Sequence, residues 1–276
     1  DTLARIEGTY GLAVLHADFP DRLVVARNGS PLIIGVGEKE MHVASDLAAL
    51  VRYTTRVAHL DDGEIATVTA GGFTTYRADL TRTQRTATTL DVDPASYEMG
   101  EDGGVPRMYR EILEQPAAAE RVLRGRLDER FGTSHLGGLN MDARELRAIR
   151  RVKVLGCGSA YYVGQMGAGL VEELARIPAD AEAASEFRYR NPIVEPDTLY
   201  VAVSQSGETI DTLLAVQEIR RKGGRVIGLV NVVGSAIARE CDGGIYLHAG
   251  PEVAVASTKA LTTMYLGFAL LALQLG

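Results

Sequence analysis

Short apolar runs alternate with amphipathic segments over the second half of the chain, and this alternation constrains the fold more than any other feature. Five runs are expected to be strands, at residues 152–156, 180–184, 199–203, 225–231 and 244–247. The segments between them have the character of helices, at residues 161–175, 185–190, 209–222 and 235–240. Strands that alternate with helices form a parallel sheet covered on both faces, so an α/β fold is predicted.

Three turns follow predicted strands, and a fourth segment opens the last predicted helix. They are Gly-Cys-Gly-Ser at 156–159, Ser-Gln-Ser-Gly-Glu-Thr at 204–209, Asn-Val-Val-Gly-Ser at 231–235 and Val-Ala-Ser-Thr-Lys at 255–259. In open parallel sheets, ligands bind at the carboxyl ends of strands, near the point where the strand order reverses. The chain lacks the Gly-x-Gly-x-x-Gly fingerprint at the first turn and has no Gly-Lys-Ser or Gly-Lys-Thr, which disfavours dinucleotides and nucleoside triphosphates.

The turn at 204–209 has the chemistry of a phosphate site. The hydroxyls of Ser204, Ser206 and Thr209 lie at the junction between a predicted buried strand and a predicted helix. The first N–H groups of a helix lack intrahelical partners. No Lys or Arg is needed, so the turn suits a neutral sugar that carries one phosphate. Glu208 and Asp211 must then point away from the anion. The alternative is a simple helix cap, with Ser206 as N-cap and Thr209 at the third helical position.

Composition narrows the class of protein further. The net charge of −7 and the pI near 5.4 argue against nucleic acid or an anionic membrane surface as partners. Cys157 and Cys241 form neither a disulfide framework nor a zinc pattern, and the five histidines are scattered, so no metal or cofactor is expected. The uncharged segment 260–276 is too short and too interrupted for a membrane span, and predicts a buried core or interface helix. A cytoplasmic protein is the expectation.

The chain is expected to contain two domains and a linker. Residues 1–80 have short β-rich runs separated by turns, which predicts an antiparallel sheet layer with one face buried. Residues 81–105 are rich in Thr, then in acidic residues, Pro and Gly, and predict an interdomain linker. The second domain, 106–276, begins with two helices at 106–114 and 116–124. The sequence begins without a methionine and stops at an apolar helix, so a fragment of a longer polypeptide is expected.

Several of these motifs occur together in one known family. The segments Leu-Gly-Cys-Gly-Ser at 155–159, Ser-Glu-Phe-Arg-Tyr-Arg at 185–190, the turn at 204–209 and Val-Ala-Ser-Thr-Lys-Ala at 255–260 resemble the isomerase domain of the glucosamine-6-phosphate synthase family. Upstream, Glu-Gly-Thr-Tyr-Gly at 7–11, Arg-Asn-Gly-Ser-Pro at 27–31 and Ala-Ser-Asp at 44–46 resemble the later half of the family's glutaminase domain. The motifs follow the family's order over nearly the whole chain.

The resemblance implies a fold and a reaction. A sugar-isomerase (SIS) subdomain with a parallel sheet flanked by helices on both faces would occupy 106–276. It would be preceded by the end of an Ntn-type glutaminase (α+β) domain at 1–80. The family is an aminotransferase and glutamine amidotransferase of amino-sugar biosynthesis: ammonia from glutamine reaches fructose 6-phosphate, giving glucosamine 6-phosphate and glutamate. The family's nucleophilic cysteine, its second SIS subdomain and the catalytic Lys, Glu and His fall outside this sequence, so the fragment is expected to be inactive.

The resemblance also implies the residues of the site. The phosphate would be bound by Ser204, Gln205, Ser206 and Thr209, and the sugar would be contacted by Ser159, Val255 and Ser257, with no catalytic residue in this chain. The ligand would be fructose 6-phosphate or glucosamine 6-phosphate, glutamine would serve the full-length enzyme, and a homodimer is implied. One departure is Ala160, where the family usually has a hydroxyl residue.

Other interpretations stay open at this point. The chain could be a non-catalytic SIS module that senses a phosphosugar, or a stand-alone phosphosugar isomerase with Glu208 and His248 as its acid–base pair. Among single residues, Cys157 is interpreted as a small buried residue more readily than as a reactive thiol. Lys259 is either a phosphate ligand or an exposed first-turn lysine, and Ser257 is either a sugar ligand or only an N-cap.

Overall fold

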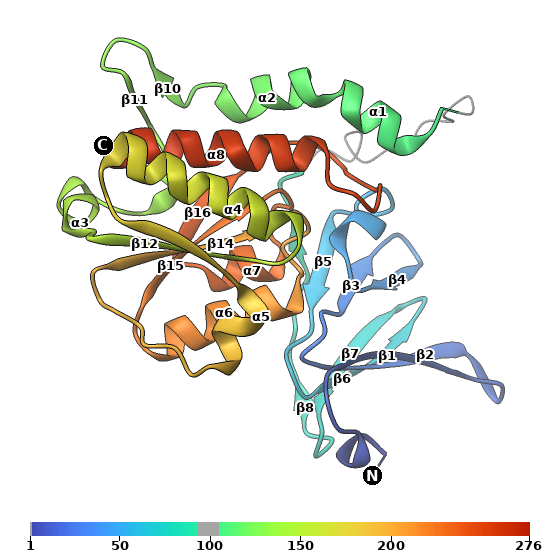
Figure 1. Ribbon diagram of the computed structural model, residues 1–276. Helices are drawn as coiled ribbons and strands as arrows, with labels where there is room; N and C mark the ends of the chain where they lie inside the picture. Colours follow the sequence, from blue (N-terminus) through green and yellow to red (C-terminus); the bar gives the residue numbers. More distant parts are fainter. Residues whose placement is uncertain (1, 93–104) are drawn as a thin grey trace. The chain divides into compact units, whose positions relative to one another are not determined.

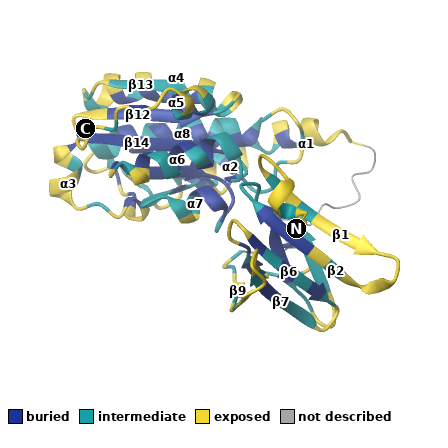
Figure 2. Ribbon diagram, turned by 90° about the horizontal axis from the view of Figure 1, so that it is seen from below, coloured by how far each residue is buried: buried dark blue, intermediate teal, exposed yellow. Residues whose placement is uncertain are grey.

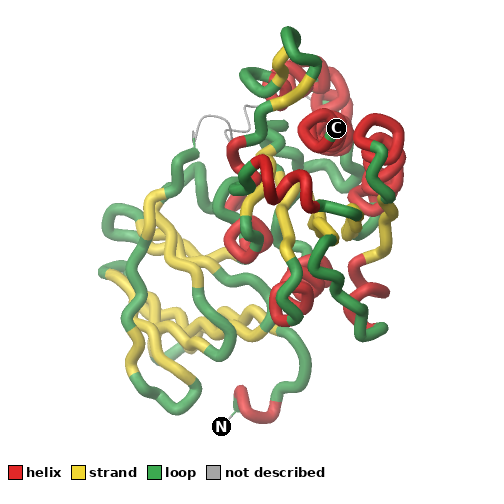
Figure 3. Tube along the Cα trace, turned by 90° about the vertical axis from the view of Figure 1, so that its left-hand side faces the viewer, coloured by secondary structure: helices red, strands yellow, loops and turns green. Residues whose placement is uncertain are grey.

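The computed structural model describes residues 2–92 and 105–276. The chain divides into two compact units, Asp1–Glu98 and Met99–Gly276. The described part of the first unit consists of strands and loops with two short 3₁₀ turns, Leu3–Arg5 and Leu47–Ala49, whereas the second unit has helices around a sheet (Figures 1 and 3).

The first unit contains two antiparallel sheets. One has the order β1-β2-β6-β7-β8 and the other the order β4-β3-β5-β9. Residues of both sheets, from Val25 and Ile34 to Ala58 and Val68, share one apolar core. Antiparallel pairing is confirmed, but the single layer predicted from the sequence is in fact two sheets. Their strands are β1 Tyr10–His16, β2 Phe19–Asn28, β3 Ile33–Val36, β4 Met41–Ala44, β5 Arg56–His59, β6 Glu64–Thr69, β7 Gly72–Arg77, β8 Arg82–Thr83 and β9 Thr88–Thr89.

The beginning of the predicted linker belongs to these sheets. Arg82–Thr83 pairs with β7, and Thr88–Thr89 pairs with β5. Arg85, between them, forms an ion pair with the buried carboxylate of Glu64 at 2.9 Å. The prediction of a linker is therefore wrong for residues 82–83 and 88–89, which are edge strands of the two sheets. The rest of the predicted linker, 93–104, lies outside the described residues.

The second unit is built on a five-stranded parallel sheet with the order β13-β12-β14-β15-β16. The strands and helices alternate as the sequence predicts. The strands are β12 Arg151–Gly156, β13 Ala179–Ala183, β14 Thr198–Ser204, β15 Arg225–Val230 and β16 Gly243–Tyr246, with the short pair β10 Leu127–Asp128 and β11 Thr133–Ser134 before them. The helices are α1 Arg107–Leu113, α2 Gln115–Leu123, α3 Ala143–Ala148, α4 Ser159–Leu170, α5 Ala184–Tyr189, α6 Ile210–Arg221, α7 Ala236–Glu240 and α8 Lys259–Leu275, with the 3₁₀ turn η4 Gly137–Leu139 and the π-helical turn η5 Val171–Ala175.

Helices cover both faces of this sheet (Figure 1). Val201 and Leu229 point to one face and pack into a core with Phe268 of α8, while Tyr200 and Val230 point to the other face and its separate core. All seven residues of β14 are buried (Figure 2). This two-sided burial is why the strand is a continuous apolar run rather than an alternating one.

The apolar last helix, α8, packs against other helices of the same chain. α8 lies against α4 and α2, and Phe268 sits over Gly167 of α4, where a Cβ would come within 2.2 Å of the ring. The expectation of a core helix is confirmed, and α8 gives no argument for a dimer. Across the part of the chain that the structure describes, no helix has the length and apolar character needed to cross a membrane.

Candidate functional site

The strand order places the switch point between β12 and β14. The chain leaves β12 toward β13 on one side of the sheet, and every later strand is added on the other side. Leu155 pairs with Ala202, so the two strands end next to each other. Helices that follow such neighbouring strands start on opposite faces and leave a crevice between them, which is where open α/β sheets bind ligands. The turns at 156–159 and 204–209 are therefore neighbours at this edge.

The hydroxyl turn is held together by its own side chains. Ser204, which is 2% exposed, accepts the N–H of Gly207 on Oγ at 3.0 Å, and the same oxygen lies 3.0 Å from Oγ1 of Thr209. Ser206 Oγ accepts the N–H of Glu208 at 3.1 Å. The N-cap of α6 is Thr209, with no side-chain cap hydrogen bond from it in the described residues. The alternative in which Ser206 caps the helix is therefore wrong.

Gly207 is required in this turn for two physical reasons. Its φ of +68° is a left-handed conformation that side chains rarely adopt, and a Cβ there would lie 1.9 Å from Ser235 Oγ. Its carbonyl oxygen also accepts the N–H of Ile237 at 2.9 Å, so the turn is fixed to α7. The glycine makes possible a close approach between the start of α6 and the start of α7.

Glu208 is directed toward α7. Its Oε1 accepts the N–H of Ala236 at 2.9 Å, at the first residue of that helix. An acid at a helix N-terminus is favourable because it opposes the helix dipole. The carboxylate thus serves α7, and the expectation that it points away from the α6 amides is supported. Desolvation and then the charges of Arg126 and Arg121 lower the pKa of His248.

The first turn lies close to the hydroxyl turn. Gly156 is so near the start of α4 that a Cβ would meet the backbone of Ala160 at 2.9 Å. Cys157 is half-buried, and its Sγ lies 3.6 Å from Oγ1 of Thr212 in the first turn of α6. Ser159, the first residue of α4, is exposed at the same edge. Cys157 therefore acts as a packing contact between the two turns, and Ser159 presents its hydroxyl to solvent.

Asn231 connects the hydroxyl turn with the segment that leads to the last helix. It is 7% exposed, and its N–H donates to the carbonyl oxygen of Gln205 at 3.2 Å. Its side chain donates to Gly250 O and accepts from Ala249 N, both at 2.8 Å. From its sequence context, Asn231 is predicted only as the start of a turn. The signal in the sequence is an amide side chain directly after the apolar run at residues 226–230.

The segment at 255–257 is anchored by a carboxylate. Ser257 Oγ donates to Glu252 Oε2 at 2.9 Å, while Glu252 Oε1 accepts the N–H groups of Thr258 at 2.8 Å and of Ala260 at 3.1 Å. Glu252 therefore caps α8, and the alternative in which Ser257 is the N-cap is wrong. Val255 is fully exposed at the tip of this segment.

Both interpretations of Lys259 fail. Its side chain is 3% exposed and forms an ion pair with Glu114, at the junction of α1 and α2. The lysine is neither an exposed first-turn residue nor free to neutralise a phosphate, because Glu114 neutralises its charge inside the second unit. This pair has no local signal in the sequence, since 145 residues separate its partners.

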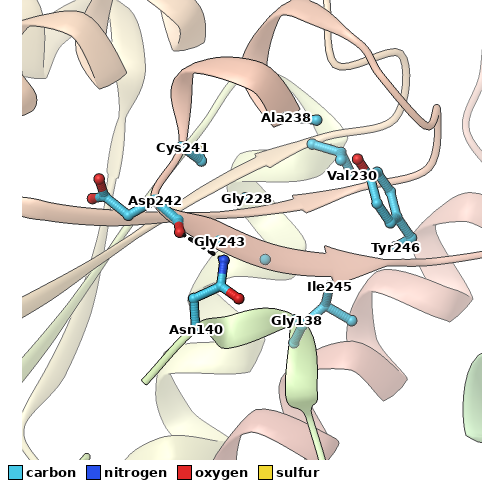
Figure 4. A pocket seen from close by; sticks show the side chains of 11 residues that line it. Gly138, Asn140, Gly228, Val230, Ala238, Cys241, Asp242, Gly243, Ile245 and Tyr246 are labelled. Atoms are coloured by element: carbon cyan, nitrogen blue, oxygen red, sulfur yellow. Dashed lines mark hydrogen bonds between the residues drawn. The ribbon is translucent and has the colours of Figure 1, made fainter. Parts of the chain in front are cut away.

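The residues predicted for the site do not line the cavity at β16. That cavity, of about 250 Å³, is lined by Asn140 and Gly138 on one side of the strand and by Ala238 and Cys241 on the other (Figure 4). Asn140 donates to the carbonyl oxygen of Asp242 at 3.0 Å. The cavity thus belongs to the edge strand of the sheet, away from the switch point.

Comparison with known proteins defines the class. Residues 145–274 match the SIS domain, so the second unit contains a SIS domain. Its fold is similar to the C-terminal domain of glucosamine-fructose-6-phosphate aminotransferase from Francisella tularensis, with a TM-score of 0.58 and 32% identity over 64% of this chain and 49% of that one.

The similarity to one kind of SIS protein extends over both units. The chain is 45% identical over 274 residues to glutamine–fructose-6-phosphate aminotransferase (isomerizing) of Chlorobaculum tepidum, covering 99% of this chain and 44% of that protein. It is 45% identical over 277 residues to the enzyme of the same name from Thermus thermophilus, covering 100% of this chain and 44% of that protein. The resemblance inferred from the motifs is confirmed: the chain is a relative of these aminotransferases and spans less than half of their length.

Proposed function

We propose that this chain is the phosphosugar-binding part of an amidotransferase that converts fructose 6-phosphate and glutamine into glucosamine 6-phosphate and glutamate. The observation that carries the proposal is the hydroxyl turn Ser204–Thr209, which sits at the start of α6 beside the switch point of a SIS-type sheet. The names of relatives at 45% identity support the choice of reaction.

The phosphate is held by Ser204, Gln205, Ser206 and Thr209. Ser204 Oγ accepts the N–H of Gly207, and its own proton can go to Thr209 Oγ1. The protons of Thr209 and Ser206 are then available for phosphate oxygens, together with the N–H groups at the start of α6. The helix dipole favours the anion, and Glu208 is directed to α7, so the turn binds a phosphate without a cationic side chain.

The sugar lies toward Ser159, Val255 and Ser257. Ser159 is the first residue of α4 on the other side of the switch point, and the hydroxyl of Ser257 donates to Glu252 Oε2. With its phosphate fixed at the turn, the sugar is held in one position against these groups, and positioning of this kind supplies much of the rate of a reaction. The chain's contribution is binding and orientation; acid–base chemistry on the sugar is assigned to residues outside this sequence, and no cofactor is invoked.

Residues 1–80 are assigned to the end of an Ntn-type glutaminase-like domain and residues 106–276 to the first SIS subdomain. The similarity of the relatives over 99% of the chain, including its first unit, supports this assignment. A homodimer and a cytoplasmic location follow from the same resemblance.

Calorimetric titration tests the proposal. Fructose 6-phosphate is expected to bind well above both fructose and inorganic phosphate, because the turn and the sugar segment each supply part of the affinity. Absence of binding by a chain that circular dichroism shows to be folded would contradict the proposal.

Two variants locate the site. Ser206→Ala and Thr209→Ala each remove one hydroxyl from the turn and are expected to weaken binding of fructose 6-phosphate by about tenfold. Thr198→Ala removes a hydroxyl from the opposite end of β14 and serves as the matched control, with unchanged affinity expected. Equal affinities for all three variants and the wild type would show that the hydroxyls of Ser206 and Thr209 do not bind the phosphate.

A further inference from the structure

The segment between β16 and α8 is held in place by side chains. Among the described residues, no backbone-to-backbone hydrogen bond is found for residues 249–257. Asn231 binds the beginning of the segment, at Ala249 and Gly250, and Glu252 binds its end, at Thr258 and Ala260. The middle, which carries the exposed Val255, needs a further anchor to keep one conformation, because each residue fixed costs about 1–2 kcal/mol of backbone entropy.

Glu111 of α1 supplies that anchor. Its Oε1 accepts the N–H of Val253 at 2.7 Å and the N–H of Ala254 at 3.1 Å. The residue is 3% exposed, and its other oxygen, Oε2, is buried with no hydrogen-bond partner in the described chain. A buried carboxylate is costly, so its two bonds to backbone amides are the interaction that offsets the cost. Hydrogen bonds to an ionised acceptor are roughly twice as strong as neutral ones.

The neighbouring residues of α1 and α2 hold the start of α8 in the same way. Glu114 forms the ion pair with the buried Lys259, and Gln115 Oε1 accepts the hydroxyl of Thr262 at 2.5 Å. Arg121 donates to the carbonyl oxygens of His248 and Ala249, both at 2.8 Å. The α1–α2 segment therefore contacts both ends of the loop, and Glu111 contacts its middle.

We propose that Glu111 is a positioning residue of the phosphosugar site. Its carboxylate fixes the amides of Val253 and Ala254, and thereby sets where Val255 and Ser257 stand relative to the hydroxyl turn. The inference rests on the proposed function for the identity of the ligand. It adds that helices α1 and α2, more than 80 residues before the hydroxyl turn in the sequence, form part of the sugar site. Glu111 touches the loop and not the ligand, so its effect falls on recognition of the sugar and not of the phosphate.

The test compares Glu111→Ala with Glu111→Gln. Glutamine keeps one acceptor oxygen at the same distance from the backbone, whereas alanine leaves both amides without it. Glu172→Ala is the matched control, since Glu172 also accepts a backbone N–H, that of Ala179 at 3.1 Å, at the start of β13. Circular dichroism and thermal unfolding establish that each variant is folded.

Two readouts follow on the whole chain. Amide hydrogen exchange at Val253 and Ala254 is expected to accelerate in Glu111→Ala by at least about tenfold, and to stay near the wild-type rate in Glu111→Gln and Glu172→Ala. Calorimetry is expected to show fructose 6-phosphate bound about tenfold more weakly by Glu111→Ala, with glycerol 3-phosphate, a phosphate monoester without the sugar, bound as by the wild type.

The outcomes separate the two claims. Unchanged exchange at both amides in Glu111→Ala overturns the positioning role. Equal loss of affinity for both ligands also overturns it, because the phosphate turn would then have been damaged. No binding of fructose 6-phosphate by the folded wild type, with exchange still dependent on Glu111, overturns the proposed function and reduces Glu111 to a structural anchor. If Glu111→Ala does not fold, Glu111→Asp replaces it, since its carboxylate is one methylene shorter. Faster exchange at the two amides and weaker sugar binding in folded Glu111→Asp support the positioning role. Wild-type exchange and affinity in this variant overturn it.

Discussion

Strand β14 in the second unit and strand β1 in the first differ in what covers them. Every residue of β14 is buried, whereas Val14 and Leu15 of β1 are 54% and 62% exposed. The parallel strands are joined through helices, so each crossover brings its own cover to the sheet. The antiparallel strands are joined by hairpins, which bring none. The second unit therefore builds a sheet buried on both faces from its own sequence, and the hydroxyl turn rests on that rigid support.

The largest effect is expected from the core of the second unit. Phe268→Ala empties a fully buried position against Gly167 and is expected to lower the free energy of unfolding of that unit by about 3–5 kcal/mol. Leu15→Ala in β1 removes a side chain that is already mostly in water, and should cost at most about 0.5 kcal/mol. Hydrogen exchange followed through a urea titration reports each unit separately. Similar losses in both would show that β1 is covered in solution.

The next effect separates two glycines with positive φ. Gly207→Ala combines a strained backbone with a contact of 1.9 Å to Ser235, and is expected to cost about 2–5 kcal/mol. Gly63→Ala, in the turn between β5 and β6, has φ of +77° but open space for a Cβ, and is expected to cost about 1 kcal/mol. Urea midpoints measure both. Adding Ser235→Gly should recover part of the loss at 207 and none at 63; recovery at neither position would mean that backbone strain alone acts.

The smallest effect is the acid sensitivity of the second unit. Glu182 binds Arg190 at 2.6 Å and Lys153 at 2.8 Å, and these hydrogen bonds, that of Arg190 first, lower the pKa of its carboxyl to about 2. Because the pKa in the folded chain lies below the ordinary glutamate value of 4.5, the contribution to stability is present above pH 4.5 and is lost as the pH falls toward 2. Since Arg190 is half-exposed, solvent screening limits the contribution of Glu182 to stability to about 1–2 kcal/mol.

Unfolding free energies measured between pH 6 and pH 3 test this contribution. Glu182→Gln should be less stable than the wild type at pH 6, and the difference should shrink at pH 3. Glu173→Gln, a change at an exposed carboxylate, is the control and should follow the wild type. A constant difference across the pH range would show that Glu182 acts through packing and not through its charge.

The regular elements of both units could be predicted from local pattern, and part of the site could not. The runs at 199–203 and 225–231 and the turn at 204–209 identified β14, β15 and the start of α6, because burial on both faces and hydroxyl-rich turns leave a local signature. The threonine-rich residues 81–92 were predicted as linker, because strands of two residues at a sheet edge leave no local signature in the sequence. Lys259 was misjudged because nothing near it in the sequence indicates an acid 145 residues away.

The sequence by itself determined that the second unit is a helix-covered parallel sheet with a hydroxyl turn after one of its strands, since periodicity, apolar runs and turn chemistry are local properties. Only the tertiary structure decided which strands are neighbours, that α8 is covered by α2 and α4, and that Glu111 reaches Val253 across 142 residues. The physical reason is that one local pattern is compatible with several strand orders and helix packings. The choice among them is made by burial and by hydrogen bonds between distant segments, which form only when the whole unit folds.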